Sequence, residues 1–276
     1  MALHHSLLAH GHSVKALRDN AKKPIKVGPV PTGSVAYPDI DTPANRDAAY
    51  KATFNVFGSN EDKHMCYRWK IPVNPLWNIA WYTDPIFLGE YPEQGIEALG
   101  NNVPEYTDSE MAIISEPVDF CGLNLYSGFP VMSDSELGWI CQERPIGNPL
   151  TAFKWSVTPE IMYWGPKFFY ERYKKPIYVT ENGMSGHDWV DESGEINDPQ
   201  RIQFLKSYLK EYKKVANEGT PIKGYFLWSL MDNFEWEQGY EERFGIVHVD
   251  FKTQERRLKD SAKWYSLCIA NQGENL

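Results

Sequence analysis

One ionisable residue stands where a strand-like segment ends. In PIYVTENGM, residues 176–184, apolar and β-branched residues run into Glu181, and the turn-forming pair Asn182 and Gly183 follows at once. Glu181 could simply be the first polar residue after a core strand. Alternatively, the strand positions its carboxylate, which could then attack an electrophile or exchange a proton.

More carboxylates follow another strand-like segment, IKGYFLWSL. Asp232, Glu235 and Glu237 stand in the Trp-rich stretch directly after it. If the two segments are neighbouring parallel strands, this acidic stretch lies close to Glu181. Two carboxylates in an aromatic cleft are typical of glycoside hydrolysis, in which one attacks or activates water and the other donates a proton to the leaving oxygen. Because surface loops often carry acids, the carboxylates alone give this chemistry only weak support.

Aromatic residues make up 14% of the 276 residues, with 10 Trp and 16 Tyr. They fit a large aromatic core as well as a cleft lined with flat rings, whose apolar faces and polar edges suit a sugar. The formal net charge of −9 argues against an extended phosphate backbone as partner, because binding one requires clustered Lys and Arg. No apolar run approaches the roughly 20 residues that span a bilayer. We therefore expect neither nucleic acid nor a membrane as partner.

The four cysteines, Cys66, Cys121, Cys141 and Cys268, lie far apart and lack the spacing of a metal site. We interpret them as free thiols in a reducing compartment, for which the cytoplasm is the simplest location. Residues 1–20 lack the basic start and the long apolar stretch of a signal peptide. The sequence contains no Gly-rich phosphate loop, nucleophile elbow or metal motif, so neither a cofactor nor a metal is expected.

Strand-like and helix-like segments alternate along the chain. Helices are expected at residues 1–20, 42–57, 158–175, 198–219 and 259–270, and strands at residues 24–30, 119–127, 176–183 and 222–230. Residues 244–251 resemble one arm of a hairpin, residues 58–118 read as short helices and loops, and residues 128–157 read as a long loop. Asp198 is expected to cap its helix. This alternation predicts an α/β fold with a parallel sheet, whose chemistry would lie at the carboxyl ends of the strands.

Several motifs together resemble glycoside hydrolase family 1, the β-glucosidase family. They are YVTENGM, GLNLYSG and GYFLWSLMDNFEWEQGYEERFGIVHVDF, with LHHSLLAHGHSVKALR and DPIFLGEYP in support. The resemblance runs from about Leu3 to Tyr265, and its TENG and WSLMDNFEW stretches are highly specific. It implies a (β/α)8 TIM barrel, a retaining mechanism through a covalent glycosyl intermediate, and no cofactor.

The resemblance also implies roles for individual residues. Glu181 matches the nucleophile that forms the covalent intermediate, and Tyr126 matches the tyrosine whose hydroxyl orients that carboxylate. Trp228 matches the ring beneath the bound sugar. Glu235 matches a residue that holds sugar hydroxyls, which overrules the interpretation of Glu235 as the proton donor.

Four further residues match the family with roles in substrate binding. Trp236 matches another residue that contacts sugar hydroxyls, and Phe244 matches a wall near the primary alcohol of the sugar. Trp155 matches the aromatic residue that flanks the leaving group. Asn124 lies in the same motif as Tyr126, and it could instead be a turn former at the strand end. For each tryptophan, packing in the core is the alternative.

The proton donor of the family is missing from this sequence. The resemblance places it in an Asn-Glu-Pro motif at the end of the fourth barrel strand, and no such motif occurs here. What remains resembles strands five to eight with their helices, a half-barrel in which residues 1–276 form one domain. The expected function is that of a retaining β-glucosidase-type hydrolase that is impaired or depends on a complementing chain.

A half-barrel needs a cover, because it has two open sheet edges and an inner face built to pack against the other half. The cover could be a second chain with strands one to four or a second copy of this chain. Alternatively, the chain is an open, remodelled half or a truncated reading frame. The competing functions are a catalytically inactive carbohydrate-binding or structural remnant and, third, a regulatory protein that docks through its open edges. The expected ligand is a β-glucoside or related unphosphorylated sugar, because Glu235 and Trp236 stand where phosphosugar members carry other residues.

Overall fold

Three parallel strands form the sheet on which the predicted site depends. The computed structural model describes residues 1–54, 79–143 and 146–276. Strands β2 (Cys121–Asn124), β5 (Ile177–Asn182) and β6 (Ile222–Leu227) pair in parallel in the order β2-β5-β6. Each strand lies within the range that the sequence assigns to it. The predicted parallel sheet is therefore confirmed for these strands.

The predicted strand at residues 24–30 is extended beside β2 but does not form a regular strand. The carbonyl oxygens of Pro29 and Pro31 accept hydrogen bonds from the backbone N–H groups of Gly122 and Asn124, at 2.9 and 3.2 Å. Proline has no N–H group to donate in return, so this pairing is one-sided. The prediction of a regular strand is wrong for this reason, although the backbone does run alongside the sheet.

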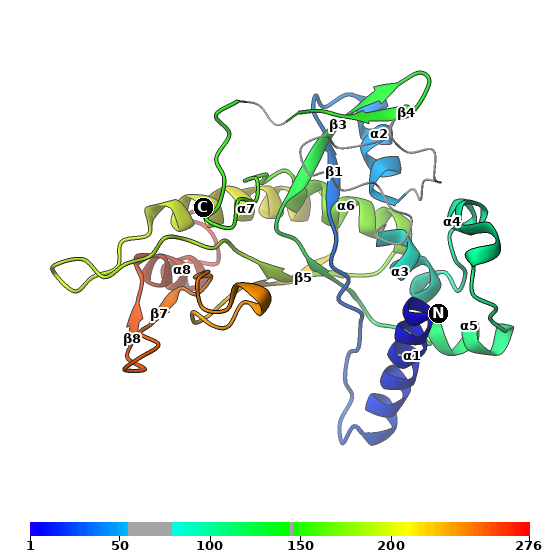
Figure 1. Ribbon diagram of the computed structural model, residues 1–276, viewed down its shortest axis with the longest axis horizontal. Helices are drawn as coiled ribbons and strands as arrows, with labels where there is room; N and C mark the ends of the chain where they lie inside the picture. Colours follow the sequence, from blue (N-terminus) through cyan, green and yellow to red (C-terminus); the bar gives the residue numbers. More distant parts are fainter. Residues whose placement is uncertain (55–78, 144–145) are drawn as a thin grey trace.

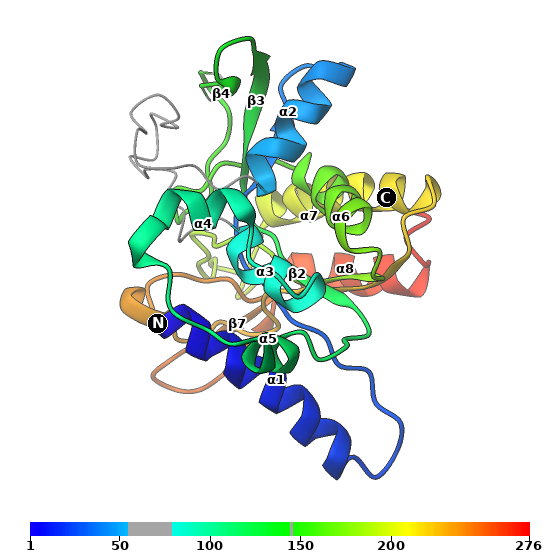
Figure 2. The same ribbon diagram turned by 90° about the vertical axis from the view of Figure 1, so that its right-hand side faces the viewer.

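The longer helices lie where the sequence places them. The predicted helices are confirmed by α1 (Ala2–Asn20), α2 (Pro43–Phe54), α6 (Ile161–Tyr173), α7 (Pro199–Asn217) and α8 (Asp260–Ala270). Residues 55–78, which the sequence assigns to a helix end and a loop-rich stretch, lie outside the described residues. The short helices that follow are α3 (Ile79–Phe87), α4 (Glu93–Leu99), the 3-10 turn η2 (Gly100–Asn102) and α5 (Asp108–Ile114). Helices α1 and α5 lie side by side (Figures 1 and 2).

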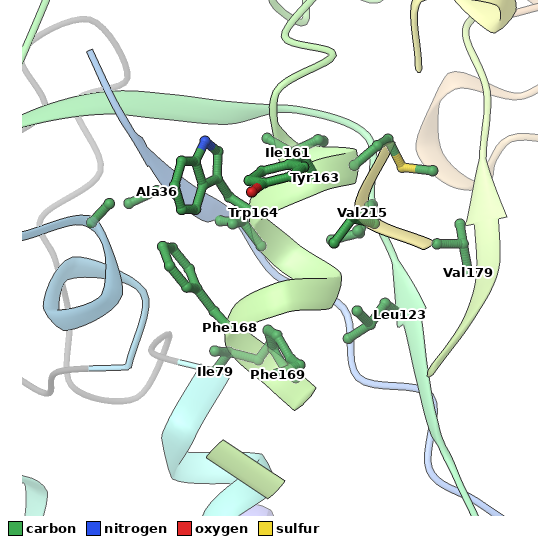
Figure 3. Close-up of a cluster of buried hydrophobic side chains, with 14 of the residues drawn as sticks. Ala36, Ile79, Leu123, Ile161, Tyr163, Trp164, Phe168, Phe169, Val179 and Val215 are labelled. Carbon is green, nitrogen blue, oxygen red and sulfur yellow. The ribbon is translucent and has the colours of Figure 1, made fainter. Parts of the chain in front are cut away.

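One face of the parallel sheet packs against α6 and α7. Leu123 of β2 and Val179 of β5 point toward the region of Phe169 in α6 and Val215 in α7, and all four side chains are fully buried (Figure 3). Burying a side chain of this size contributes roughly 1.5–3 kcal/mol to stability. Because alternate residues of a strand face opposite sides, this core also determines which residues of β2 and β5 face away from the helices.

Apolar side chains near the outer strand of this sheet are exposed to solvent. Phe226 of β6 is 58% exposed, and Leu230, in the segment after β6, is 63% exposed. Val30, in the extended segment at the other side of the sheet, is also exposed. Exposed apolar groups at the open sides of a sheet are what the sequence analysis expects of a half-barrel without its cover.

A second sheet replaces part of the loop predicted at residues 128–157. β3 (Gly128–Asp134) pairs antiparallel with β4 (Gly138–Cys141), and β1 (Val35–Pro38) pairs in parallel with β3 (Figure 1, top). The loop prediction is wrong here because glycines at the strand starts and a proline within β3 are local loop signals. Val131 in β3 is fully buried, so tertiary packing overrides those signals.

The chain after β6 ends in a hairpin and a helix. The 3-10 turn η3 (Trp236–Gln238) precedes β7 (Val247–Val249) and β8 (Arg256–Leu258), which pair antiparallel. This confirms the predicted hairpin, and α8 follows it directly (Figure 1, lower left). Among the described residues, none of the helices combines the length and the apolar character that a membrane crossing requires.

Asp198 stands at the N-cap position of α7, as predicted, but its carboxylate does not cap that helix. The carboxylate instead accepts hydrogen bonds from the backbone N–H and the hydroxyl group of Ser261 in α8, at 2.8 and 2.5 Å. It also pairs with Arg201 one turn into α7. Asp198 therefore ties α7 to α8, and the predicted capping bond is replaced by tertiary contacts.

A buried acid joins α3 to α6. Asp84 is 2% exposed and accepts hydrogen bonds from the Nε and Nη2 groups of Arg172, at 2.8 and 2.6 Å. The hydroxyl of Tyr173 donates a third hydrogen bond to the same carboxylate, at 2.7 Å. These bonds and the negative charge of Asp84 raise the pKa of Arg172, although burial opposes them. The Arg172 guanidinium thus keeps its charge and its directional hydrogen bonds in a largely buried place.

Replacing Asp84 by alanine should lower the free energy of unfolding by about 3 kcal/mol, because the substitution leaves the Arg172 guanidinium without its partner. Urea unfolding followed by tryptophan fluorescence measures the change. The matched control is Asp41→Ala, which breaks an exposed pair with Arg46 whose two side chains are 56% and 51% exposed. That pair should contribute no more than about 1 kcal/mol. Equal losses in the two variants would contradict the structural role assigned to Asp84.

Candidate active site

Glu181 and Tyr126 meet at the ends of adjacent strands. The Tyr126 hydroxyl donates a hydrogen bond of 2.7 Å to Oε2 of Glu181. Tyr126 follows β2, and Glu181 is the penultimate residue of β5. The backbone pairing of the two strands continues to this point, because the N–H of Leu125 donates to the carbonyl of Glu181 at 2.9 Å. The backbone thus brings the two side chains together.

A buried amide links all three strands beside Glu181. The side-chain N–H of Asn182 donates to the carbonyl of Leu125 at 2.7 Å, and the Tyr225 hydroxyl of β6 donates to Oδ1 of Asn182 at 2.8 Å. Asn182 is fully buried. The sequence suggested only a turn role for this residue. Because Asn182 is the next residue after Glu181, a shift of its backbone would also move the Glu181 carboxylate.

Gly183 allows the end of β6 to come close. A Cβ atom at this position would lie 1.8 Å from the carbonyl oxygen of Trp228, so no larger residue fits. The N–H of Trp228 donates to the carbonyl of Asn182 at 2.9 Å, and the peptide bond between Trp228 and Ser229 is cis. The Trp228 backbone is thereby held next to the end of β5.

Glu235 lies close enough to Glu181 for the charge of one carboxylate to affect the other. Its pKa is raised, first by burial and then by the negative charges of Glu181 and Glu242. A hydrogen bond from the Trp228 side chain opposes this rise. The described structure therefore brings Glu181, Tyr126, Trp228 and Glu235 together, as the sequence analysis predicts.

Aromatic rings surround Tyr126. Its ring centroid lies 5.2 Å from that of Trp155 and 6.3 Å from that of Phe244, and the latter two are 6.0 Å apart. Phe153 lies against Trp155 at 4.5 Å. Phe244 is only 2% exposed, so in this structure it packs among the other rings and does not face solvent. Burial, together with the bond to Glu181, raises the pKa of Tyr126, and its hydroxyl therefore keeps its proton.

The two remaining predicted residues lie at the margin of this group. Asn124 pairs in register with Glu181, and its Oδ1 accepts a hydrogen bond of 2.8 Å from the Thr180 hydroxyl. Trp236 follows Glu235 in the chain but is 82% exposed. The described residues thus leave Trp236 in solvent, and its role in sugar contact stays a prediction.

Other acids of the same stretch have different surroundings. Asp232, one of the acids that the sequence places near Glu181, is buried and pairs with Arg243 and Lys259. Glu242 was not singled out, yet its charge acts on Glu235 and one of its buried oxygens has no partner among the described residues. Only its position in the motif YEERFG could have indicated it. No group of His, Cys, Asp or Glu in the described ranges is arranged to hold a metal ion.

The chain is similar to known glycosyl hydrolases. The family model of glycosyl hydrolase family 1 matches residues 71–274. β-Glucosidase A of Thermotoga maritima is 37% identical over 99% of this chain, which covers 56% of that protein. A β-glucosidase of Agrobacterium sp. is also 37% identical, over 96% of this chain and 54% of its own length.

Solved structures show the same likeness. The structure of the Thermotoga maritima β-glucosidase in complex with castanospermine matches with a TM-score of 0.78 at 37% identity. Its complex with deoxynojirimycin matches with a TM-score of 0.77 at 38% identity. This chain is covered to 99% in both cases, whereas it spans 56% of each solved chain. The chain therefore belongs to glycosyl hydrolase family 1, and its α/β fold corresponds to about half of the TIM barrel of that family.

Proposed function

We propose that this chain is the nucleophile-bearing half of a retaining β-glycosidase of the β-glucosidase type, equivalent to barrel strands five to eight. The observation that carries the proposal is the 2.7 Å hydrogen bond between Tyr126 and Glu181 at adjacent parallel strand ends. Trp228 and Glu235 lie beside this pair. The indole of Trp228 suits the C–H face of a sugar, and the carboxyl group of Glu235, whose pKa is raised, suits its hydroxyl groups. Nearly full coverage by β-glucosidases at 37% identity supports the same assignment.

The chemistry would proceed in two displacements at the anomeric carbon. An oxygen of Glu181 attacks that carbon and forms a glycosyl ester, while the bond to the leaving oxygen breaks and its electron pair departs with that oxygen. Water then attacks the same carbon and gives a proton to the base that the missing half would supply or, without it, to solvent, and Glu181 leaves as a carboxylate. The Tyr126 hydroxyl holds Glu181 in a fixed orientation throughout, which lowers the cost of reaching the reactive geometry.

The leaving oxygen must receive a proton from outside the residues matched here. The family's Asn-Glu-Pro motif is absent from this sequence. General acid help contributes about 10²–10⁴-fold to such a reaction. Alkyl glycosides would therefore react slowly with this chain alone, whereas aryl glycosides with acidic phenols as leaving groups need little protonation.

The partner that we propose is a polypeptide that supplies the other half of the barrel. The exposed Phe226, Leu230 and Val30 lie at the two open sides of the sheet, where such a partner would pack. The chain spans about half the length of its relatives, so a partner of similar size would complete the barrel. A second copy of this chain is the alternative cover.

The proposed substrate is an unphosphorylated β-glucoside or related sugar, and the proposed location is the cytoplasm. Glu235 and Trp236 occupy the positions expected for members that take unphosphorylated sugars. Cys121 and Cys268 are buried thiols outside any disulfide, which supports a reducing compartment.

Covalent trapping tests the nucleophile directly. The probe is 2,4-dinitrophenyl 2-deoxy-2-fluoro-β-glucoside, whose fluorine slows turnover of the intermediate and whose leaving group needs no acid. Mass spectrometry should detect one fluoroglucosyl group on the peptide that contains Glu181. Glu181→Gln should abolish the label, and Glu237→Gln, which removes an exposed acid of the next loop, should leave it unchanged.

The trapping experiment also separates the alternatives. Label on a residue other than Glu181 would refute the mechanism. If no label forms but deoxynojirimycin changes the tryptophan fluorescence, the chain is a carbohydrate-binding remnant. If neither response occurs, even with a partner present, the chain is a structural remnant or acts through docking alone.

Removing the Tyr126 hydroxyl should slow the labelling of Glu181. A hydrogen bond to a charged group contributes about 1.5–3 kcal/mol, so Tyr126→Phe should lower the rate of labelling by about 10–100-fold. The matched control is Tyr163→Phe, which removes a hydrogen bond of 2.6 Å to Glu218 in another part of the chain. A rate unchanged by Tyr126→Phe would show that the hydroxyl does not orient the nucleophile.

Co-expression tests the proposed partner. The probe is the part of Thermotoga maritima β-glucosidase A that this chain does not match. We expect the two chains to co-purify and to hydrolyse a β-glucoside with an alkyl leaving group, because the partner supplies both the acid and the apolar cover. Phe226→Glu should weaken the complex, whereas Leu267→Glu, on exposed α8, should not. Sedimentation showing a stable dimer of this chain alone would favour the alternative cover.

A further inference from the structure

A network of buried charges joins the segment that follows β5 to the segment that follows β6. It consists of Asp188, Asp198, Arg201, Asp232, Arg243 and Lys259, hereafter the buried ion network. The network balances three acids against three bases. Burial of charges at this depth is tolerated only when each is paired and hydrogen-bonded.

Lys259 is the member that joins the two loops. It is fully buried just before α8, and its Nζ lies 2.6 Å from Asp188 and 2.8 Å from Asp232. Asp188 belongs to the loop that begins after Glu181, and Asp232 belongs to the loop that contains Glu235. One ammonium group therefore connects the two segments that present the candidate carboxylates.

Asp232 organises the loop that contains Glu235. Its Oδ1 also accepts the backbone N–H of Gly245 at 3.1 Å, and its Oδ2 accepts from Arg243 at 2.5 Å. A Cβ atom on Gly245 would lie 2.1 Å from the backbone nitrogen of Asp232, so the two ends of this loop are in close contact. The two ends of the loop thus meet at the Asp232 carboxylate, which also accepts a hydrogen bond from Lys259.

The loop after Glu181 is fixed to the same centre. Arg201 donates from one nitrogen to Asp188 at 2.7 Å and to the carbonyl of Arg243 at 2.9 Å. The backbone N–H of Gly186 donates to that same carbonyl at 3.0 Å. The two loops therefore meet at backbone level, and Lys259 bridges their carboxylates.

We propose that Lys259 is a positioning residue that sets the place of Glu235 relative to Glu181. This inference rests on the proposed function in one respect, namely that both carboxylates serve one sugar. Lys259 itself touches neither of them and acts through Asp188 and Asp232. Without it, Asp188 and Asp232 lose their shared cation, and the side-chain bridge that fixes the Glu235 loop relative to the loop after β5 is broken.

The titration of Glu235 in the intact chain tests the proposal without any turnover. Carbon-13 labelled glutamate is followed by NMR as the pH is changed, and Glu235→Gln assigns the signal. In the unaltered chain the pKa of Glu235 should lie above that of an ordinary glutamate, because of burial and the charge of Glu181. In Lys259→Met the elevation should be largely lost, since the loop carries Glu235 into water and away from Glu181.

The control replaces a more exposed lysine that lies outside the buried ion network. Lys263 lies on α8 and is half exposed, where it pairs with Glu195 and Asp260. Lys263→Met should leave the Glu235 titration unchanged. Because the titration needs no hydrolysis, a chain that fails the trapping experiment still reports on Lys259, and the two proposals fail separately.

A second variant guards against misfolding and against a pure charge effect. Asp188→Asn combined with Lys259→Met removes one acid and one base, so the buried charges stay balanced while the bridge is lost. We expect a folded chain by circular dichroism in which the Glu235 pKa elevation is again lost. An unchanged Glu235 titration in either folded variant would overturn the proposal. Failure of both variants to fold would also overturn it, because Lys259 would then serve folding alone.

Discussion

The pairing of β2 with β5 is the constraint on which the candidate site depends. Backbone hydrogen bonds, such as the one from Leu125 to the Glu181 carbonyl at 2.9 Å, bring the two strand ends together before any side chain acts. The Tyr126 hydroxyl then reaches Glu181 at 2.7 Å without the help of a flexible loop. Because burial raises the pKa of Tyr126, that hydroxyl remains a donor. A donor placed by backbone pairing needs little reorganisation to hold a carboxylate in a reactive orientation.

Local patterns predicted the parallel strands of this part of the molecule and placed Glu181 at a strand end, whereas Tyr126 and Trp228 were assigned from the resemblance to the family. Glu181, Tyr126 and Trp228 each stand at the end of an apolar run, and alternation of strands with helices places such ends on one side of a parallel sheet. The patterns could not give the register. A shift between β2 and β5 places Asn124 opposite Glu181, and a buried Asn182 then ties both strands to β6. Contacts of this kind depend on partners that no local window contains.

Charged residues show most clearly where local reasoning fails. Asp232 and Glu235 belong to one acidic stretch and look alike in the sequence, yet Asp232 is buried between two cations while Glu235 lies near another carboxylate. The difference is made by Arg243 and by Lys259, which comes from a later segment of the chain. Asp198 gives the same lesson, because its expected capping bond is replaced by bonds to a distant helix. The second sheet was missed for a related reason, since burial outweighed its loop-like residues.

Glu235 and Glu242 are in surroundings that destabilise their charged carboxylates. Burial and the charges of Glu181 and Glu242 raise the pKa of Glu235, and one buried oxygen of Glu242 has no partner among the described residues. By contrast, Arg243 and Lys259 neutralise the buried carboxylate of Asp232. A buried carboxylate oxygen without a partner among the described residues, such as that of Glu242, carries a desolvation cost that the paired oxygens of Asp232 avoid. Neighbouring acids in one stretch therefore differ sharply: paired cations surround Asp232, which holds its loop together, whereas burial and other acids raise the pKa of Glu235.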